Sequence, residues 1–359
     1  MRVRLVYNPV AGQRDVAGDL KKVVAFLSEQ GWQVDLCQTM GPGDAITFAR
    51  EAAASGYDMA VAVGGDGTIG EVATGLALTD CALGVLPVGT GNVWAHMLRL
   101  PIWSPMNRSS LLDAARVLVT GETRCIDLGR ANERYFVLWS GIGFDAQVAR
   151  DVEPHRDVRR SLGNLAYVVA AVAEAIVMRG TRVTITIDER TMRMRAVLIL
   201  VSNAQLYGPS WQVLPEARLD DGLLDVCILK GGNTLDLVRH LVMILTGHHV
   251  NDPRIEIYRA TEVRVRADKP LPLHLDGDPV GYTPVTIRVV PKALKVIVPQ
   301  WATLSQLFQG GHEQPEISIA RRIAARLALE RERWRTGRRR LRDDLERRLK
   351  WLSSDERNS

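Results

Sequence analysis

The amino-acid sequence predicts an α/β fold for its first third and a mainly antiparallel β fold for the part that follows, with a helical extension at the C-terminus. Short apolar runs alternate with helical patterns up to about residue 120, and this alternation is typical of a doubly wound parallel sheet covered on both faces. Apolar strands separated by turn residues then dominate. We therefore expect three regions, at 1–120, 121–305 and 306–359.

The expected elements of the first region are strands at 3–8, 32–37, 57–63 and 82–88, and helices at 15–31, 43–56 and from about residue 68. The second region is expected to hold strands at 135–146, 181–188, 192–203, 222–231, 262–268, 271–281, 283–290 and 293–299, and helices at 163–180 and 234–247. Ligands of open parallel sheets bind beyond the carboxyl ends of the strands. We expect the functional site at those ends.

Composition indicates a globular protein, because 46% of the residues are hydrophobic and 24% are charged. The start of the chain lacks the pattern of an export signal, and no apolar run is long enough to span a bilayer, so a cytoplasmic location is expected. The four cysteines are isolated and contain no CxxC pair, which favours reduced core thiols over a zinc site. Basic residues concentrate after residue 316 and account for the net charge of +5.

Glycine-rich breaks follow three of the predicted strands. The segments are NPVAG after the first strand, GGDGT after the third and PVGTGN after the fourth. Glycines let the backbone approach a ligand, and the N-terminus of a following helix directs N–H groups toward it, an arrangement that favours phosphate. One such loop could be only a tight turn, but three on one rim favour a nucleotide site. Asp66 would either order the loop or face a metal ion.

The motifs together resemble those of the diacylglycerol kinase catalytic family, which includes bacterial lipid kinases and sphingosine kinases. They are YNPVAG, VGGDGTIGEV, LPVGTGNVWA, SGIGFDA, GNLAY, PEARLDDGLLDV and LDGDP, in colinear order between about residues 1 and 299. GGDGT alone is also found in NAD kinases, whereas the later motifs are more specific. The resemblance implies an α/β ATP-binding domain and an antiparallel β-sandwich domain that binds the lipid.

The resemblance also implies an ATP site between the two domains. Its residues, carried over by motif, are Asn8, Pro9, Ala11, Gly12, Thr39, Gly64, Gly65, Gly67, Thr68, Glu71, Gly89, Thr90 and Asn92. Arg14 and Arg160 stand where the family often has basic residues that neutralise phosphate, although a solvated surface arginine is an equal alternative.

A Mg²⁺ site is implied in the segment RLDDGLLDV. The ligands that match the family are the Asp221 carboxylate and the carbonyls of Arg218 and Leu223, with Asp127 reached through water. The residues by themselves would also suit an ordinary hairpin turn.

The catalytic candidates are Asp278, with Asp276 as its alternate, and Asp66 beside an active-site Mg²⁺. Two carboxylates that flank a glycine at a turn can face one site, where one accepts the proton of an attacking hydroxyl. Most relatives have glutamate at the position of Asp278, and many diacylglycerol kinases have aspartate at the position of Val93. The first difference shortens the reach of the base, and the second removes a phosphate or metal contact.

The expected function is therefore an ATP-dependent lipid kinase that phosphorylates a hydroxyl of diacylglycerol or of a sphingoid-type base. Two alternatives stay open: phosphorylation of a soluble acceptor, as in NAD kinase, and a non-catalytic regulator that binds nucleotide and lipid. The sequence does not distinguish the lipid or the oligomeric state.

Residues from 317 onward have apolar side chains at helical spacing with arginines between them. A helix that lies on an anionic membrane, a coiled-coil contact in a homodimer and a solvated helix packed on its own domain are the three alternatives. Nucleic acid is not expected as a partner, because no nucleic-acid-recognition domain accompanies the basic residues.

Overall fold

Four parallel strands form the N-terminal sheet of the computed structural model, which describes residues 1–12, 16–102, 109–144, 146, 180–209 and 211–311. Their order is β2-β1-β3-β4, with β1 at Arg2–Tyr7, β2 at Gln33–Gln38, β3 at Met59–Gly64 and β4 at Ala82–Pro87. Every residue of β3 and β4 is buried. Continuous apolar strands of this kind are expected where helices cover both faces.

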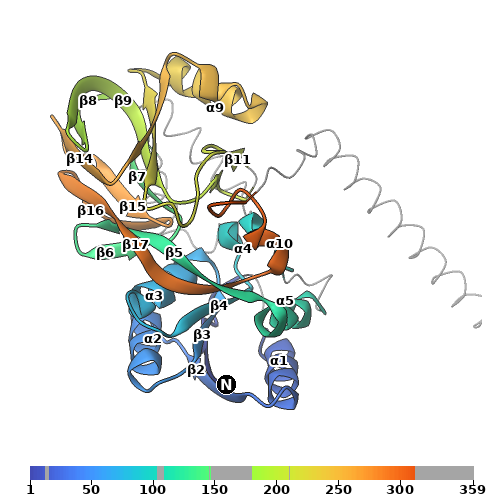
Figure 1. Ribbon diagram of the computed structural model, residues 1–359. Helices are drawn as coiled ribbons and strands as arrows, with labels where there is room; N and C mark the ends of the chain where they lie inside the picture. The colour runs from blue at the N-terminus through green and yellow to red at the C-terminus, as the bar shows by residue number, and fades with distance from the viewer. Residues whose placement is uncertain (13–15, 103–108, 145, 147–179, 210, 312–359) are drawn as a thin grey trace, which may run out of the picture. The chain divides into compact units, whose positions relative to one another are not determined.

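Helices cover the sheet on both faces, as the sequence predicts (Figure 1). Helices α1 (Ala17–Glu29) and α5 (Ser109–Thr120) pack together on one face, and α2 (Asp44–Ala54) and α3 (Asp66–Leu76) on the other. In α1 the buried side chains Leu20, Val23 and Leu27 recur at the spacing of one helix face. The doubly wound α/β fold is confirmed, although the sequence analysis missed α5.

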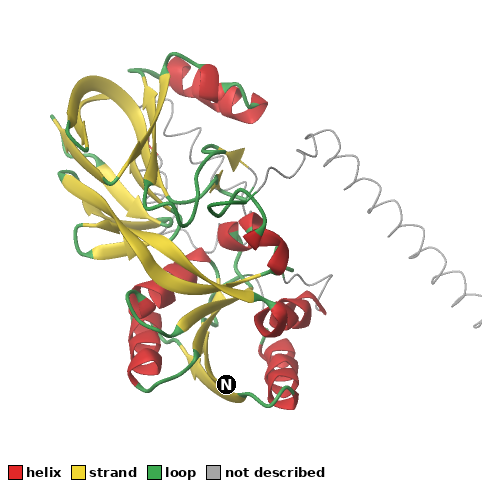
Figure 2. Cartoon of the chain, viewed as in Figure 1, coloured by secondary structure: helices red, strands yellow, loops and turns green. Residues whose placement is uncertain are grey.

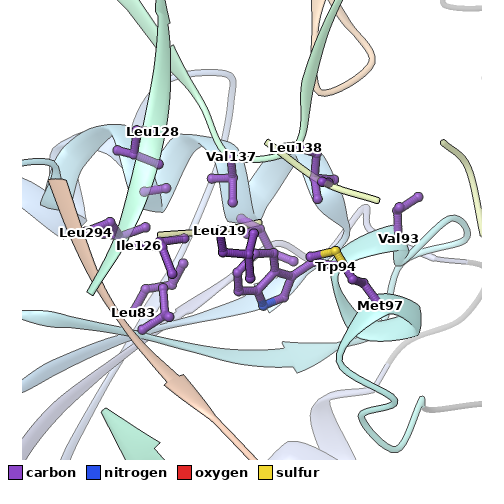
Figure 3. Close-up of a cluster of buried hydrophobic side chains, with 14 of the residues drawn as sticks. Leu83, Val93, Trp94, Met97, Ile126, Leu128, Val137, Leu138, Leu219 and Leu294 are labelled. Atoms are coloured by element: carbon purple, nitrogen blue, oxygen red, sulfur yellow. The ribbon is translucent and has the colours of Figure 1, made fainter. Parts of the chain in front are cut away.

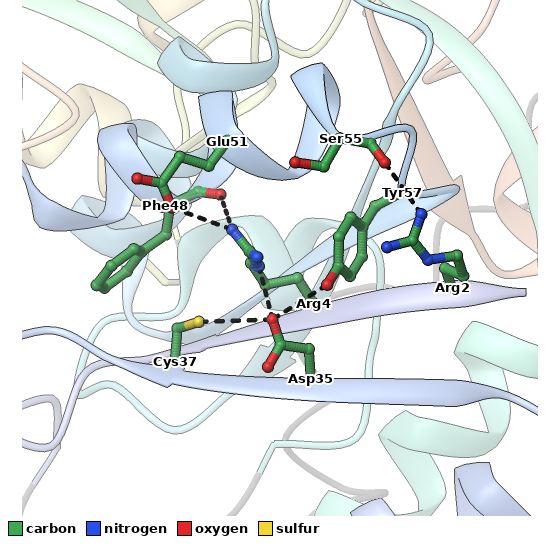
Figure 4. A network of polar contacts seen from close by, with 8 residues as sticks. All are labelled: Arg2, Arg4, Asp35, Cys37, Phe48, Glu51, Ser55 and Tyr57. Atoms are coloured by element: carbon green, nitrogen blue, oxygen red, sulfur yellow. Dashed lines mark hydrogen bonds and ion pairs between the residues drawn. The ribbon is translucent and has the colours of Figure 1, made fainter.

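A network of polar contacts fastens α2 to β1 and β2 (Figure 4). The Arg4 guanidinium donates to the Asp35 carboxylate at 3.0 Å and to Glu51 of α2 at 3.3 Å. The Tyr57 hydroxyl donates to the same Asp35 carboxylate at 3.2 Å, and the Arg4 guanidinium lies 4.7 Å from the Tyr57 ring centroid. The network therefore fixes α2 on the sheet, and α2 in turn packs against α3.

The C-terminal part is antiparallel and forms the expected β-sandwich (Figure 2). Its strands are β5 Glu122–Ala131, β6 Arg134–Phe136, β7 Trp139–Gly143, β8 Thr181–Ile187, β9 Arg190–Ser202, β10 Leu206–Tyr207, β11 Trp211–Gln212, β12 Leu224–Lys230, β13 Ile255–Ala260, β14 Glu262–Ala267, β15 Pro272–Leu275, β16 Asp278–Tyr282 and β17 Val285–Val298. The sequence analysis missed β5 and β13. It also treated 135–146 as one strand, whereas two residues separate β6 from β7.

Strand β17 belongs to both parts of the fold. It pairs antiparallel with β14 and β5 through most of its length, and Val296 near its end pairs parallel with Leu83 of β4. Its register shifts between Val290 and Leu294, where Lys292 has a φ of 49°. The sequence analysis expected two strands here, because this β-bulge interrupts the alternation of apolar residues.

Short helices complete the described fold: α4 at Val93–Met97, α9 at Thr234–Thr246, a 3₁₀ turn η2 at His249–Asn251 and α10 at Gln300–Thr303. Helix α9 matches the helix expected at 234–247. The helices expected at 163–180 and after residue 317 lie outside the described residues. Cys81 and Cys227 are buried, as expected, but Cys37 is only half-buried and Cys125 is exposed.

One hydrophobic cluster joins the two parts of the fold (Figure 3). Trp94 of α4 and Leu83 of β4 belong to it, and so do Val137, Leu138 and Leu219 from the C-terminal part. Trp94 is among the largest side chains that are fully buried. Helix α4, which follows the PVGTGN loop, is therefore held by packing against both parts.

We expect Trp94→Ala to lower the free energy of unfolding by about 3–5 kcal/mol, because the change leaves a large cavity in this cluster. Urea unfolding monitored by circular dichroism measures the loss. The partly exposed Trp211 serves as the control, since Trp211→Ala removes the same side chain from the surface and should change the value by less than about 0.5 kcal/mol. Equal losses for the two variants would contradict the prediction.

Candidate active site

The three glycine loops meet at the carboxyl ends of β1, β3 and β4, as the sequence predicts. A Cβ on Gly89 would lie 2.4 Å from the Cα of Gly65, and a Cβ on Gly12 would lie 2.1 Å from the Val88 carbonyl oxygen. These distances are too short for any side chain, and Gly12 also has a φ of 77°. The loops therefore pack backbone against backbone, which only glycine permits.

Asn8 ties the first loop to the start of α3. Its Nδ2 donates to Thr68 Oγ1 at 3.0 Å, and its Oδ1 accepts the Val10 N–H at 3.1 Å. Gly65 is the N-cap of α3, and as a glycine it supplies no side chain to cap the helix. The N-terminus of α3 therefore starts beside the glycine loops, and a helix N-terminus favours an anion.

Asp66 orders the loops. Its two carboxylate oxygens accept the N–H groups of Val93 at 3.0 Å and Trp94 at 3.1 Å, at the start of α4. A Cβ on Gly91 would lie 3.1 Å from Asp66 Oδ2 and would crowd this carboxylate. Of the two roles expected for Asp66, the hydrogen bonds support the ordering of the loop.

Further predicted ATP-site residues lie at the same edge. Buried Asn92 has a left-handed backbone, with a φ of 51°, and its Nδ2 donates to the Gly89 carbonyl at 2.6 Å. Glu71 of α3 accepts the N–H of Gly43 at 3.0 Å. Thr39 is buried directly after β2, with its N–H bound to the Tyr7 carbonyl at 2.8 Å. The remaining ones are half-buried Pro9, Ala11 and Gly67, buried Gly64 and exposed Thr90.

Val93 does not direct its side chain toward the loops. It is 4% exposed and belongs to the hydrophobic cluster of Trp94, as Figure 3 shows. Only its N–H contributes to the site, through Asp66. Arg14 and Arg160, predicted beside the phosphates, lie outside the described residues.

Two carboxylates of the β15–β16 hairpin face the start of α3. The turn consists of Asp276 and Gly277, with φ values of 49° and 96°, as in the type I′ turns that favour Asp-Gly. A Cβ on Gly67 would lie 3.3 Å from Asp278 Oδ2, and a Cβ on Gly70 would lie 3.2 Å from Asp276 Oδ2. The GGDGT and LDGDP segments, more than 200 residues apart in the sequence, are thus brought together.

The Asp276 carboxylate accepts three successive backbone N–H groups, from Val137 at 2.8 Å and from Leu138 and Trp139 at 2.9 Å. The Asp276 N–H in turn donates to the Trp139 carbonyl. Two of the three donors, Val137 and Leu138, are the residues that separate β6 from β7, and the third, Trp139, is the first residue of β7. Asp278 differs, because its residue is exposed at the start of β16. The geometry therefore gives Asp276 a positioning role and leaves Asp278 at the surface that faces α3.

Burial raises the pKa of Asp276 to about 7, although its three N–H bonds act in the opposite direction. The nearby Asp66 carboxylate adds a smaller upward effect. Asp276 is therefore a carboxyl group whose protonation changes near neutral pH.

His274 supports the same turn, a role that the sequence analysis missed. Its ring is buried in β15, and Nδ1 accepts the Gly277 N–H at 3.2 Å. The signal in the sequence was a histidine two residues before Asp276 in a strand of otherwise apolar residues. Alternation places both on one side of the strand.

A second group of carboxylates surrounds the turn after Leu219. Asp127 accepts the N–H groups of Gly222 at 2.6 Å and Lys292 at 2.7 Å, and Asp221 accepts the Leu223 N–H at 3.1 Å. Burial raises the pKa values of both groups, and mutual repulsion between neighbouring aspartates raises them further.

Asp225, which the sequence analysis did not select, belongs to this group. Burial raises its pKa to about 6, and its Oδ2 is buried without a hydrogen-bond partner. Asp225 Oδ1 lies 3.4 Å from the Arg259 guanidinium. Over the described residues, no three His, Cys, Asp or Glu side chains form a metal-binding group. A cation here would therefore need backbone carbonyls among its ligands.

Comparisons with known proteins agree with this architecture. Residues 2–131 match the diacylglycerol kinase catalytic domain family, and residues 140–298 match the YegS C-terminal NAD kinase beta sandwich-like domain. A diacylglycerol kinase of Bacillus subtilis (strain 168) is 34% identical over 301 residues, which cover 83% of this chain and 97% of that protein. One of Staphylococcus carnosus (strain TM300) is 26% identical, with coverage of 86% and 98%.

The fold agrees with a solved structure as well. A crystal structure of a diacylglycerol kinase from Bacillus anthracis str. Sterne superposes with a TM-score of 0.63 at 23% identity, covering 84% of this chain and 98% of that chain. The chain belongs to the diacylglycerol kinase catalytic family, and it is an ATP-dependent lipid kinase. In the described part of the chain, the search for helices with the length and hydropathy of a membrane span found none.

We expect the stability of the protein to fall between about pH 4 and pH 7 through Asp276. An unfolded aspartate loses its proton near pH 3.9, whereas folded Asp276 keeps it to about pH 7. The contribution of Asp276 to the free energy of unfolding is thus fully present below pH 4. It is lost as the pH rises through 7, and the loss is up to about 4 kcal/mol.

Unfolding by urea at several pH values, without nucleotide or metal, measures this effect for the wild type and for Asp276→Asn. The difference between the two free energies of unfolding should change over this pH range. A difference that is constant with pH would contradict the prediction.

Proposed function

We propose that this kinase transfers the γ-phosphate of ATP to the hydroxyl of a diacylglycerol. The names of the relatives that match along nearly their whole length support diacylglycerol over a sphingoid-type base. The single observation that carries the proposal is the approach of Asp278 in the β-sandwich to Gly67 at the start of α3. This approach brings a carboxylate of the C-terminal part beside the glycine loops of the N-terminal part.

The glycine loops would hold the phosphates of ATP. Gly12, Gly65 and Gly89 pack backbone against backbone, so no side chain separates their N–H groups from a ligand. Helix α3 starts beside them at the N-cap Gly65, and a helix N-terminus favours negative charge. Mg²⁺ that accompanies ATP supplies further neutralisation of phosphate charge when bound. Because Asp66 gives both oxygens to α4, we assign it to the ordering of this cradle.

Asp278 would act as the general base. As the lipid hydroxyl oxygen forms its bond to the γ-phosphorus, the bond between that phosphorus and the β–γ bridging oxygen breaks and ADP leaves. The hydroxyl proton passes to the Asp278 carboxylate. Direct transfer of this kind needs positioning and charge neutralisation rather than a covalent enzyme intermediate. Asp276 and His274 would hold the turn that places Asp278.

The aspartates after Leu219 fit a structural cation. Asp127 and Asp225 are buried, half-buried Asp221 lies near enough to raise the pKa of each of them, and Asp225 Oδ2 has no hydrogen-bond partner. Oxygen ligands of this type suit Mg²⁺. The Asp221 carboxylate with the carbonyls of Arg218 and Leu223 would hold it, and Asp127 would act through water, since N–H groups occupy both of its oxygens.

We expect Asp278→Asn to lower kcat by about 10²–10⁴-fold with the KM for ATP unchanged, because the amide keeps the shape of the base but does not accept the proton. Radiolabelled ATP and diacylglycerol in mixed micelles provide the assay. Asp278→Glu, which keeps a carboxylate on a side chain one methylene longer, should keep activity well above that of the asparagine variant.

Glu133→Gln is the matched control, since it neutralises an exposed acid in the β5–β6 turn and should leave kcat unchanged. Wild-type turnover by Asp278→Asn would contradict the role of this residue. Label that appears on NAD rather than on lipid, or tight nucleotide binding without any labelled product, would contradict the function itself.

We expect Mg²⁺ to raise the melting temperature of the wild type in the absence of nucleotide, and Asp221→Asn to abolish the rise. A ligand that binds only the folded state stabilises it by about 2.7 kcal/mol at 100 times its Kd. Differential scanning calorimetry with Mg²⁺ against EDTA measures this. Glu216→Gln removes an exposed acid nearby and should keep the increase in melting temperature caused by Mg²⁺. If Asp221→Asn also kept this increase, the ion would bind elsewhere and the prediction would be wrong.

A further inference from the structure

Helix α9 presents an apolar stripe to the outside of the molecule. Its exposed side chains are Leu235, Val238, Leu241, Val242 and Leu245. They recur at the spacing of one helix face, about a third of the circumference, along a helix about 20 Å long. Val250 continues the exposed apolar surface just past the helix. We define these six residues as the α9 face.

The opposite side of α9 packs on the sandwich through both apolar and polar side chains, and Ile244 of α9 joins the hydrophobic cluster of Trp94. His240 is fully buried, and its Nε2 contacts the Lys230 carbonyl of β12 at 2.6 Å. The Arg239 guanidinium pairs with the Asp252 carboxylate at 2.8 Å. An ordinary surface helix turns its apolar residues inward and its charges outward. In α9 the buried His240 and the partly buried Ile244 make inward contacts, while a further set of leucines and valines is exposed.

The ends of α9 are also closed, so the stripe belongs to a well-formed helix. Asn233 is the N-cap, and its side chain accepts the Asp236 N–H at 3.0 Å. Gly247 ends the helix in the left-handed conformation, with a φ of 74°. The exposure of the leucines and valines is therefore not the result of a frayed helix end.

Charges around α9 are matched within the protein. The ion pairs are Arg239–Asp252, Arg254–Asp236 at 2.7 Å and Lys230–Glu256 at 2.8 Å. Three bases and three acids thus cancel. A contact made by this face would depend on the burial of apolar groups, with little dependence on salt.

An exposed tryptophan lies beside the helix. Strand β11, at Trp211–Gln212, contacts α9, and the Trp211 residue is 37% exposed. Tryptophan is enriched where proteins meet the boundary between lipid headgroups and acyl chains. Exposed apolar side chains that gather on one side of a helix, rather than occurring singly, are typical of an interaction site.

We propose that the α9 face docks the kinase on the surface of a lipid bilayer, by inserting leucine and valine side chains between the headgroups. This inference rests on the proposed function, because a kinase whose acceptor is a diacylglycerol must reach a molecule that sits in a membrane. A helix of this kind lies in the plane of the interface with its apolar side buried. Because the charges around α9 are balanced, this docking would depend on burial of apolar side chains. Attachment by an arginine-rich segment would instead depend on attraction to anionic lipids.

The test uses a charge-neutral double variant, Leu235→Asp with Leu245→Lys. The residues are 78% and 49% exposed, so little packing is lost. An acid in the first turn and a base in the last turn also suit the helix dipole. The matched control is Leu78→Asp with Leu304→Lys, at residues that are 66% and 70% exposed away from α9. Circular dichroism and thermal melting verify that both variants fold.

Co-sedimentation with phosphatidylcholine vesicles, without ATP, measures docking. We expect wild-type binding to be nearly independent of salt and the α9 variant to bind at least about tenfold more weakly, with the control unchanged. Kinase assays should then show reduced activity of the α9 variant on diacylglycerol in vesicles and wild-type activity on a short-chain diacylglycerol in detergent micelles. Because sedimentation needs no turnover, it decides the docking even if no lipid is phosphorylated and the proposed function fails.

Three results would overturn the inference. Unchanged vesicle binding by the α9 variant would exclude this face, and binding that is lost in high salt would assign the membrane contact to basic residues. A wild-type dimer that the α9 variant converts to monomer, with vesicle binding unaffected, would show that a second copy of the chain covers the face. Analytical ultracentrifugation provides that last measurement.

Discussion

The arrangement of the site depends on one carboxyl group. Asp276 accepts the N–H groups of Val137, Leu138 and Trp139, and a hydrogen bond of this kind contributes about 0.5–1.5 kcal/mol net. They end β6, start β7 and hold the β15–β16 hairpin against that junction. Asp278 lies two residues farther along the hairpin and consequently faces Gly67. Without Asp276, the hairpin would lose the contacts that set the position of the proposed base.

Much of this site could be predicted from the sequence because it follows from topology. Parallel strands end at one edge, so loops containing Gly12, Gly65 and Gly89 had to converge. What each carboxylate does was harder to predict, since its partners lie far along the chain. Asp66 binds residues 27 and 28 positions away, and Asp276 binds residues more than 130 positions away. Motif spacing indicates that such residues matter, but only the fold determines whether they order a loop or face a substrate.

Sequence periodicity was least informative where a strand or helix departs from the usual rule. The bulge at Lys292 made one strand resemble two. In α9 the apolar residues predicted a helix but not its orientation, because His240 is the residue that turns inward while Leu235 is exposed. Asp225 lies within the apolar strand β12, and nothing in that strand's sequence marks it as a site residue. Its burial close to Asp221 becomes visible only in the folded protein. In each of these cases tertiary packing overrides the local pattern.

The shared strand β17 has a mechanical consequence. Strand β17 pairs with β14 at Ile287 opposite Val263 and, beyond the bulge, with β4 at Val296 opposite Leu83. A motion of one half relative to the other would therefore have to bend β17 or break its pairing with β4. Deleting one residue from β17 would turn its following side chains to the opposite face. The number of residues in β17 thus affects how the two halves of the fold are aligned with each other.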